Sequence, residues 1–283
     1  MKNIVIHIKA PDQKGIVSKY TQTLSSMDVN IINLEQHVEP DDLLFFMRIH
    51  AVTPKENSDI AVIKNRLGEI DKEIHSISSI YDLDYRQNMA ILVTKESLPL
   101  YDILIKNQTG EIKSNISLIV SNHKDLESVA NQFKIDFLYV DIDSDRNKAN
   151  ANLNDILVSN NIDMVVLARY MQIIPDDIVR RFDGKMINIH HGFLPAFKGD
   201  HPYRQAWKRG VKIIGATSHY VTDELDEGPI ITQDVVPVSH HHSISEMMDS
   251  GRNLERNVLV DAIKAHLEYR IIIHGKRTII FNK

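Results

Sequence analysis

Three polar residues in the second half of the chain have side chains that could open a carbonyl compound. Asn188 and His190 stand two positions apart in an otherwise apolar run, and Asp226 follows in a turn-forming segment. Because side chains alternate between faces along a strand, Asn188 and His190 point to one side while Ile187 and Ile189 pack on the other. An amide donor, an imidazole that charges near neutrality and a carboxylate that moves protons can together stabilise a tetrahedral oxyanion. The pattern therefore predicts acyl chemistry without a protein nucleophile.

Each of these residues also has a structural interpretation. An asparagine at a strand end often forms a turn, a buried histidine can simply be hydrogen-bonded, and an aspartate before Gly228 can cap a turn. The catalytic interpretation therefore depends on the three side chains meeting at one place.

The composition bounds the class of protein. With 283 residues, 43% of them hydrophobic and 25% charged, the chain is expected to be a soluble globular protein of two domains. Its net charge of −5 argues against a nucleic-acid partner. The absence of cysteine excludes disulfides, thiolate metal sites and a cysteine nucleophile. The start lacks a secretory signal and no run approaches the roughly 20 apolar residues of a membrane span, so we expect a cytoplasmic protein without a membrane partner.

The first part of the chain predicts a βαββαβ unit. The expected strands cover residues 4–8, 29–38, 43–52 and 76–85, and the expected helices cover residues 15–26 and 58–74. Such a unit forms a small antiparallel sheet with two helices on one face. The polar residues 85–88 then form a linker.

The second part predicts a doubly wound, mostly parallel sheet. Residues 89–94 are apolar throughout, as in a strand covered on both faces. Strands then alternate with helices, the strands at 116–120, 137–140, 164–167 and 186–189 and the helices at 124–133, 146–159 and 176–182. A helix around residues 254–263 and a hairpin around Gly275 follow. Ligands of such sheets bind beyond the carboxyl ends of the strands, where Asn188 and His190 stand.

Three ordered segments carry a family resemblance. Residues 188–199, 215–222 and 225–233 resemble the formyltransferase family that uses 10-formyltetrahydrofolate, and the likeness runs through most of residues 89–281. The first 84 residues resemble an ACT domain. The combination is similar to the formyltetrahydrofolate deformylase family. The resemblance implies an α/β fold with an ACT (ferredoxin-like) amino-acid-sensing and oligomerisation domain at 1–84, a linker at 85–88 and a formyltransferase-like catalytic domain at 89–283.

The resemblance also implies a reaction and roles. Water would hydrolyse 10-formyltetrahydrofolate to formate and tetrahydrofolate, which supplies formate for purine synthesis and balances one-carbon pools. Asn188 would donate to the formyl oxygen, His190 would carry a proton toward the departing nitrogen, and Asp226 would hold the attacking water. The folate is the substrate, so no cofactor is expected. Formyl transfer to an amine and a folate sensor without turnover are the alternatives.

The expected folate pocket maps to two loops. Backbone groups there would meet the pterin, and apolar side chains would cover its faces. The alternative is that this apolar run is core. The expected pocket residues are Leu167, Met171, Gln172, Ile173, Ile174, Val221, Thr222 and Asp223.

The segment after the first strand of the second part argues for water as the acceptor. A related transferase acting on glycinamide ribonucleotide needs a glycine-rich loop there to hold a phosphate. Residues 93–99 contain no glycine, and Glu96 would repel a phosphate. An acceptor with a phosphate is therefore not expected.

Two residues depart from the usual deformylase pattern. Gly192 stands where the family commonly has serine, which removes a hydroxyl and is expected to loosen the loop. Asp200 stands where a small residue is common and would add a carboxylate near the pocket. We expect both to affect substrate affinity more than the type of reaction.

The remaining histidines are expected to have structural roles. Strand alternation predicts that His191 faces away from His190, and His219 is expected to support the site from behind. The run His240, His241 and His242 lacks the spacing of a tetrahedral site, so no metal is predicted.

The first unit suggests a small-molecule effector. Asp12 is expected to cap the first helix, and Gly15 would let the backbone-like groups of a ligand approach beside Ile16. An ordinary capped turn is an equally good interpretation. By resemblance to ACT modules, glycine or methionine is the candidate effector, and a homo-oligomer, a dimer or a tetramer, is expected.

Overall fold

The computed structural model describes residues 1–54, 59–142, 145–197, 199 and 201–282. The described chain forms two compact units. The first contains residues 1–86 together with two pieces from the end of the chain, Glu268–Ile272 and residues 279–282, and the second contains Gln87–Leu267 and Ile273–Thr278. Each unit is described by itself below.

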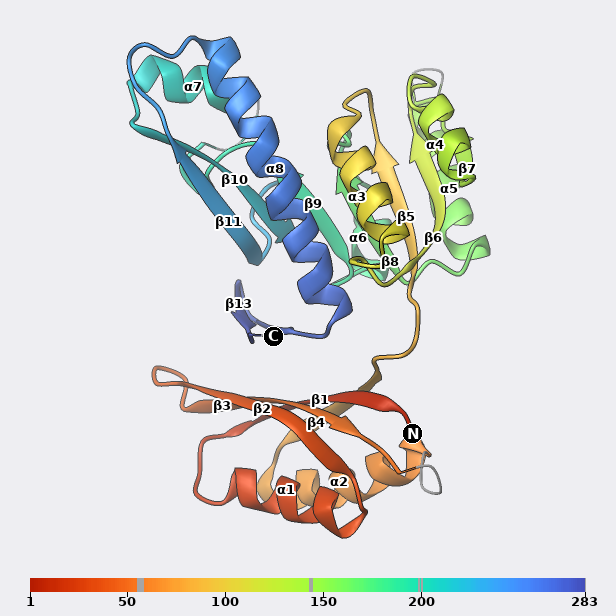
Figure 1. Cartoon of the computed structure of the whole chain (residues 1–283), viewed down its shortest axis with the longest axis vertical. Helices are drawn as coiled ribbons and strands as arrows, with labels where there is room; N and C mark the ends of the chain where they lie inside the picture. Colours follow the sequence, from red (N-terminus) through yellow and green to blue (C-terminus); the bar gives the residue numbers. More distant parts are fainter. Residues whose placement is uncertain (55–58, 143–144, 198, 200, 283) are drawn as a thin grey trace. The chain divides into compact units, whose positions relative to one another are not determined.

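The first unit is a four-stranded antiparallel sheet with two helices. Its strands follow the order β2-β3-β1-β4, and β1 pairs with β3 on one side and with β4 on the other. This is the predicted βαββαβ order, and the two helices lie together on one face of the sheet (Figure 1). The elements are β1 (Asn3–Pro11), α1 (Ile16–Ser26), β2 (Asn30–Glu39), β3 (Leu44–Val52), α2 (Ile60–Ile74) and β4 (Ile77–Asp82).

Apolar periodicity places these elements. In α2 the buried residues Ile63, Leu67, Ile70 and Ile74 recur every three or four positions, which makes one apolar stripe that faces the sheet. Alternate residues of β1 and β3 meet this stripe in a single core. Asp59 caps α2 by accepting a hydrogen bond from the Ala61 backbone, and the expected helix start at Ser58 lies outside the described residues.

The predicted cap of the first helix is wrong. α1 begins at Ile16, and its N-cap is Gly15, which has a φ of +93° and gives no side-chain cap. Asp12 lies three residues earlier, where its backbone N–H donates to Leu43 O at 2.8 Å. The reason is that the chain after β1 first pairs with the turn before β3 and only then enters the helix. Ile16 is buried in the core of the unit.

The end of the chain completes the first unit. Arg48 Nε and Nη2 donate to Tyr269 O at 2.8 Å and to Glu268 O at 3.0 Å. The same Tyr269 carbonyl lies 2.8 Å from His7 Nε2, and the Tyr269 ring stacks on Tyr81 with centroids 4.3 Å apart. The sequence-based boundary placed these residues with the catalytic half, whereas their contacts lie in the first unit.

The second unit is built on a seven-stranded sheet of order β11-β10-β9-β8-β5-β6-β7. The strands from β9 to β7 are parallel, and β10 and β11 add an antiparallel edge. The strands are β5 (Asn88–Val93), β6 (Asn115–Ser121), β7 (Asp136–Tyr139), β8 (Met164–Ala168), β9 (Met186–His190), β10 (Ile213–Tyr220) and β11 (Ile230–Pro237), and a small hairpin of β12 (Ile271–His274) and β13 (Arg277–Ile280) follows.

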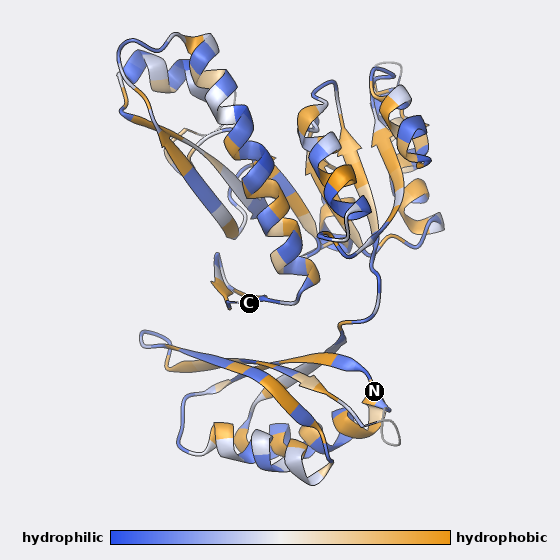
Figure 2. Cartoon of the chain, in the orientation of Figure 1, coloured by the Kyte–Doolittle hydropathy of each residue, from blue (hydrophilic) through white to orange (hydrophobic). Residues whose placement is uncertain are grey.

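Helices connect and cover these strands (Figure 1). Residues of α5 and α6 share one apolar core with Ala90 and Leu92 of β5, while the alternate residues Met89 and Ile91 are also buried. Figure 2 shows β5 and β6 as almost continuously hydrophobic ribbons, as expected for strands covered on both faces. The helices are α3 (Leu98–Gln108), α4 (Glu127–Phe133), α5 (Arg146–Ser159), α6 (Asp176–Arg181), α7 (Pro202–Arg209) and α8 (Ile244–Leu267).

The predicted fold class, a mostly parallel doubly wound sheet after a small βαββαβ unit, is confirmed. The strand order places β9, β8 and β5 side by side, so the segments after these strands meet at one edge of the sheet. Helix α8 contacts β9, β10, β11 and α3, and it therefore passes close to the same edge.

Candidate active site

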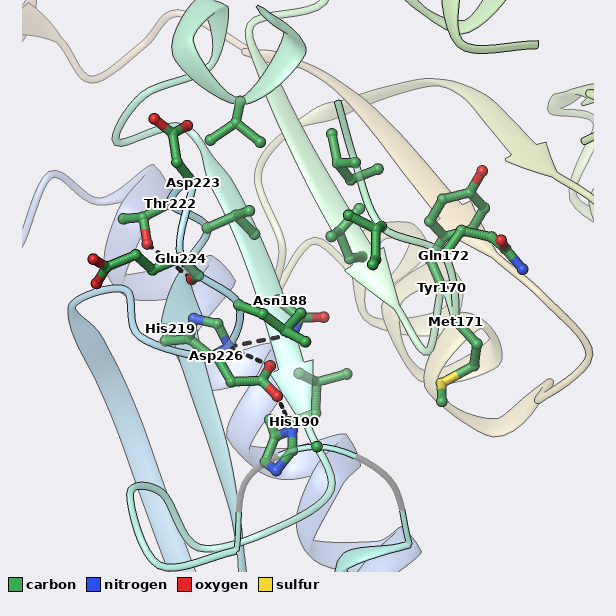
Figure 3. A pocket seen from close by; sticks show the side chains of 18 of the residues that line it. Tyr170, Met171, Gln172, Asn188, His190, His219, Thr222, Asp223, Glu224 and Asp226 are labelled. Carbon is green, nitrogen blue, oxygen red and sulfur yellow. Dashed lines mark hydrogen bonds and ion pairs between the residues drawn. The ribbon is translucent and has the colours of Figure 1, made fainter. Parts of the chain in front are cut away.

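A cavity of about 440 Å³ opens at the carboxyl ends of β8 and β9. Asn188, His190 and Asp226 all line it, and so do the residues of both expected folate loops. In Figure 3 Met171 lies on one side of this cavity and Thr222 on the other, with the three candidate catalytic residues between them. The structure thus brings the predicted catalytic and folate-binding residues to one place.

Strand pairing fixes the positions of Asn188 and His219. Leu167 of β8 pairs with Asn188 of β9, and on the other side His219 of β10 is the direct partner of Asn188. Directly opposite residues of neighbouring strands have their side chains close together. The Asn188 Nδ2 atom accordingly lies 3.2 Å from His219 Nε2.

A tight turn after β10 brings Asp226 to the site. Asp226 has a φ of +56°, a conformation that aspartate tolerates better than most residues. Tyr220 N donates to Pro229 O at 2.9 Å, so the turn closes on the strand that precedes it. A Cβ at Gly228 would lie 1.7 Å from Tyr220 O, so only glycine fits where the turn crosses the strand.

Asp226 joins the two histidines. Its Oδ2 lies 3.3 Å from His190 Nδ1, and its Oδ1 lies 3.7 Å from His219 Nε2. His219 Nδ1 lies 2.8 Å from Tyr220 O, and because a carbonyl can only accept, Nδ1 carries the hydrogen. His219 Nε2 is then left to accept from Asn188, whose second N–H remains for a ligand. His219 therefore orients the amide, which is the supporting position predicted for it.

The surroundings of His190 favour its charged form. Burial lowers the pKa of His190, but hydrogen bonds to the Asp226 carboxylate and to Phe197 O outweigh burial, and the net pKa is raised. Both ring nitrogens face acceptors, since Nε2 lies 2.8 Å from Phe197 O. Burial raises the pKa of Asp226, and the hydrogen bond and positive charge of His190 outweigh burial, leaving its pKa far below the usual range. The pair is therefore an imidazolium beside a carboxylate.

The expectation that Gly192 loosens its loop is wrong. A Cβ at Gly192 would lie 2.9 Å from both His190 Nε2 and Phe197 O, so the glycine allows the hydrogen bond between them. Thr217 Oγ1 secures the same loop by donating to Gly192 O at 2.9 Å and accepting from Leu194 N at 3.1 Å. The loop is packed tightly because its carbonyl groups bond to neighbouring side chains. Asp200 lies outside the described residues.

The predicted orientation of His191 is also wrong. β9 ends at His190, so the alternation of faces does not extend to the next residue. His191 lines the same cavity, and its ring centroid lies 5.4 Å from that of His190. Burial and the nearby charge of Arg169 lower the pKa of His191 to about 3, which keeps this ring neutral.

The apolar side chains of the first expected folate loop are partly in the core and partly exposed. Leu167 and Ile174 belong to the apolar core of the unit, as the alternative interpretation expects. Met171 and Ile173, however, are 52% and 66% exposed, although both are large and apolar. Exposed apolar side chains beside a cavity are typical of a ligand surface. Thr94 fixes this loop because its Oγ1 accepts from Met171 N at 3.0 Å.

The run His240, His241 and His242 has ordinary contacts. His242 Nδ1 lies 3.0 Å from Ser239 N and 3.1 Å from Ser239 Oγ, and the rings of His240 and His241 lie 3.9 Å apart. Within the described ranges, the side chains form no group of three or more potential metal ligands. A search of the same residues finds no helix that is long and apolar enough to cross a bilayer.

Sequence reasoning missed several residues of the cavity. Arg169 and Tyr170 lie within the first expected folate loop, residues 168–174, although they were not among the expected pocket residues. The others open helices or follow β10, and nothing local marks them. They include Arg146, Asp176, Glu224 and Leu225.

Comparison with known proteins gives a consistent result. The formyl transferase family matches residues 87–263. Formyltetrahydrofolate deformylase of a Synechocystis species is 40% identical over 97% of this chain and 96% of its own. The crystal structure of a formyltetrahydrofolate deformylase from Pseudomonas syringae pv. tomato has a TM-score of 0.96 and is 38% identical, covering 100% of this chain and 95% of that chain.

A transferase is similar to part of the chain. The structure of glycinamide ribonucleotide transformylase 1 from Symbiobacterium toebii covers 70% of this chain and 95% of that chain, with a TM-score of 0.66 and 31% identity. The deformylases match nearly the full length. By sequence, by structure and by the extent of the match, this chain belongs to the formyltetrahydrofolate deformylase family of enzymes.

Proposed function

We propose that this enzyme hydrolyses 10-formyltetrahydrofolate to formate and tetrahydrofolate, with Asn188, His190 and Asp226 as its catalytic residues. The observation that supports these roles most strongly is the single network in which Asp226 contacts His190 and His219, while His219 holds Asn188 (Figure 3). An amide donor, an imidazolium and a carboxylate face one cavity.

The mechanism follows from this arrangement. Water held by Asp226 attacks the formyl carbon, and the free N–H of Asn188 donates to the oxygen that becomes negative. The bond from the carbon to N10 then breaks, and His190 delivers a proton toward that nitrogen. Formate and tetrahydrofolate are left.

The two proton transfers are coupled. The pKa of Asp226 is low chiefly because a charged His190 lies beside it. When His190 gives up its proton, that support disappears and the carboxylate becomes a stronger base. Asp226 can therefore take the proton of the attacking water as His190 protonates the leaving nitrogen.

The folate is proposed to lie between the two loops. The pterin would stack on the exposed Met171 and Ile173, and the backbone of Val221, Thr222 and Asp223 would meet its donors and acceptors. No cofactor is proposed, because the groups of this network suffice for hydrolysis of a formamide.

The test uses purified protein and 10-formyltetrahydrofolate with no amine present, and formate is measured. Hydrolysis predicts formate from water alone. Asn188→Ala should slow release by about 100- to 1,000-fold, the usual cost of one oxyanion donor. Formate that appears only after an amine is added would favour transfer instead, and binding of the folate without formate would favour a sensor.

For the first unit we propose an ACT-type regulatory role in a cytoplasmic homo-oligomer. Glycine or methionine would bind beside Asp12 and Gly15, where the chain enters α1 with an uncapped first turn. Because the Ile16 side chain is buried, only its backbone is proposed to take part. Isothermal titration that detects no heat with either amino acid would remove the proposal, and light scattering measures whether the protein is a dimer or a tetramer.

A further inference from the structure

Arg169 lines the cavity but has no part in the mechanism above, and it belongs to a second set of polar and charged side chains. We call it the α8 charge cluster, and it consists of Glu96 after β5, Arg169 after β8, Tyr203 in α7, and Arg252 and Glu255 in α8. The two strands among these elements, β5 and β8, end at the sheet edge where the cavity opens.

Glu255 is the centre of this cluster. Only 2% of its side chain is exposed, its Oε1 accepts from Tyr203 Oη at 2.7 Å, and its Oε2 lies 3.5 Å from Arg169 Nη1. A Cβ at Gly251 would lie 1.9 Å from Tyr203 Oη, so the tyrosine fits into the gap that this glycine leaves on α8. Arg252 Nε lies 3.7 Å from Glu96 Oε2. The cluster is therefore a tightly packed network.

Arg169 is held at a cost in stability. Its φ is +62°, in the left-handed region that is unfavourable for a residue other than glycine. Its Nε and Nη1 atoms are buried and have no hydrogen-bond partner, and burial of unpaired donors is also unfavourable. The 3.5 Å contact with Glu255 offsets only part of this. A residue kept under two such costs beside a reaction site is expected to serve the reaction.

Arg169 follows directly after β8, the strand that pairs with β9. Leu167 of β8 pairs with Asn188 of β9, and β8 ends at Ala168. Arg169 and His190 both line the cavity.

We propose that Arg169, held by Glu255 and Tyr203, determines the acceptor by filling the space beside His190 through which an amine would approach the formyl carbon. Its Nε and Nη1 atoms are buried and only 18% of the side chain is exposed, so the guanidinium is held in place beside the cavity. Water is small enough to reach the carbon past it. This inference rests on the proposed hydrolysis and explains why the acceptor is water.

The loop after β5 adds a separate constraint on a phosphate-bearing acceptor. It lacks the glycines that such an acceptor needs, and it carries the Glu96 carboxylate, whose Oε2 lies 3.7 Å from Arg252 Nε.

The test is a double variant, Arg169→Gly with Glu255→Gln. Glycine accepts the positive φ without strain, and glutamine removes the charge that would otherwise stay buried without its partner. The proteins turn over 10-formyltetrahydrofolate in rising hydroxylamine, a small uncharged amine. Its nitrogen would attack the formyl carbon, the bond to N10 would break, and the proton lost by the amine would pass to N10. Formate and formohydroxamate are both measured.

The wild-type protein is expected to give formate with little formohydroxamate, and the double variant is expected to raise the hydroxamate-to-formate ratio at least about tenfold. The matched control is Arg256→Gln with Asp102→Asn, which removes another ion pair of α8, with an Nη2 to Oδ1 distance of 2.6 Å, and should leave the ratio unchanged. Tyr203→Phe keeps the ring and only releases Glu255, so it should raise the ratio by a smaller factor.

An unchanged ratio in a folded double variant would overturn the proposal, and so would loss of both products. If the double variant does not fold, an unchanged ratio in Tyr203→Phe has the same meaning. Failure of the proposed function is seen separately, because the wild-type protein would then release no formate in water alone.

Discussion

Replacing Asp226 by asparagine removes the negative charge next to His190 while keeping the size of the side chain. The two atoms that face each other, His190 Nδ1 and Asp226 Oδ2, lie 3.3 Å apart, and the side chains are only 5% and 8% exposed. At an effective dielectric constant of about 20, unit charges at this distance interact with about 5 kcal/mol. That energy corresponds to roughly three to four pKa units. Burial then dominates, so we expect the pKa of His190 to fall below 6.5.

The direction of the pH effect follows from the same pair. In the wild-type protein the pKa of His190 is raised, so the proton donor persists to a higher pH than that of an ordinary histidine and is lost as the pH rises through this raised pKa. In Asp226→Asn the donor should already be lost at a lower pH. The rate at neutral pH should fall by about 100- to 10,000-fold, the range for loss of general acid and base assistance.

Two measurements check this prediction. Formate release is followed from pH 5 to 9, and the imidazole of His190 is titrated by nuclear magnetic resonance in both proteins. Asp176→Asn is the matched control, because Asp176 lines the same cavity but does not touch His190 in this structure. A His190 pKa in Asp226→Asn that equals or exceeds the wild-type value would refute the electrostatic reasoning.

Three further predictions concern packing and stability. Gly228→Ala places a methyl group 1.7 Å from Tyr220 O and should lower the free energy of unfolding, measured in urea, by at least about 3 kcal/mol. Gly68→Ala in α2, where nothing lies within 4 Å, should raise it by up to about 1 kcal/mol. Equal unfolding midpoints for the two variants would contradict this. Thr217→Val removes the hydroxyl that donates a hydrogen bond to the loop after His190, so it should lower the free energy of unfolding by about 1–3 kcal/mol and also lower kcat/KM. Thr217→Ser keeps the hydroxyl and should restore both. A stable, fully active valine variant would contradict this prediction. Burial lowers the pKa of His266 to about 4, so between pH 6.5 and pH 4 the unfolded chain binds a proton that the folded chain does not. The free energy of unfolding should therefore fall by up to about 3 kcal/mol by pH 4. In His266→Gln this decline, measured by unfolding at each pH, should be smaller.

Local patterns were sufficient to predict the order of elements in the first unit, most of the parallel strands of the second and the three candidate catalytic residues, but not α3, α7 or the edge strand β11. The apolar run of residues 89–94 and the alternation after it predict a parallel sheet, and alternation of faces alone predicts that Asn188 and His190 leave β9 together. The turn that carries Asp226 is marked by its glycine and proline. These features depend on neighbours in the sequence, which is why they were found.

Other features depend on contacts between distant residues and left no local signal. The Gly192 loop appears loose from its sequence, yet Phe197 O and Thr217 make it one of the closest-packed parts of the site. His191 was assigned to the wrong side because the end of β9 is set by pairing with its neighbours. Glu255 gives no sign in α8 that it is buried, since only the packing of Tyr203 and Arg169 around it excludes water.

The way in which the end of the chain folds into the first unit has a consequence for biosynthesis. Arg48 and His7 find their acceptor in Tyr269 O, at separations of 221 and 262 residues along the chain. During translation the sheet of the first unit leaves the ribosome long before Tyr269 does. Until Tyr269 has been translated, the guanidinium of Arg48 and the imidazole of His7 lack this acceptor and are hydrogen-bonded to water. The first part to be made is thus among the last to be finished.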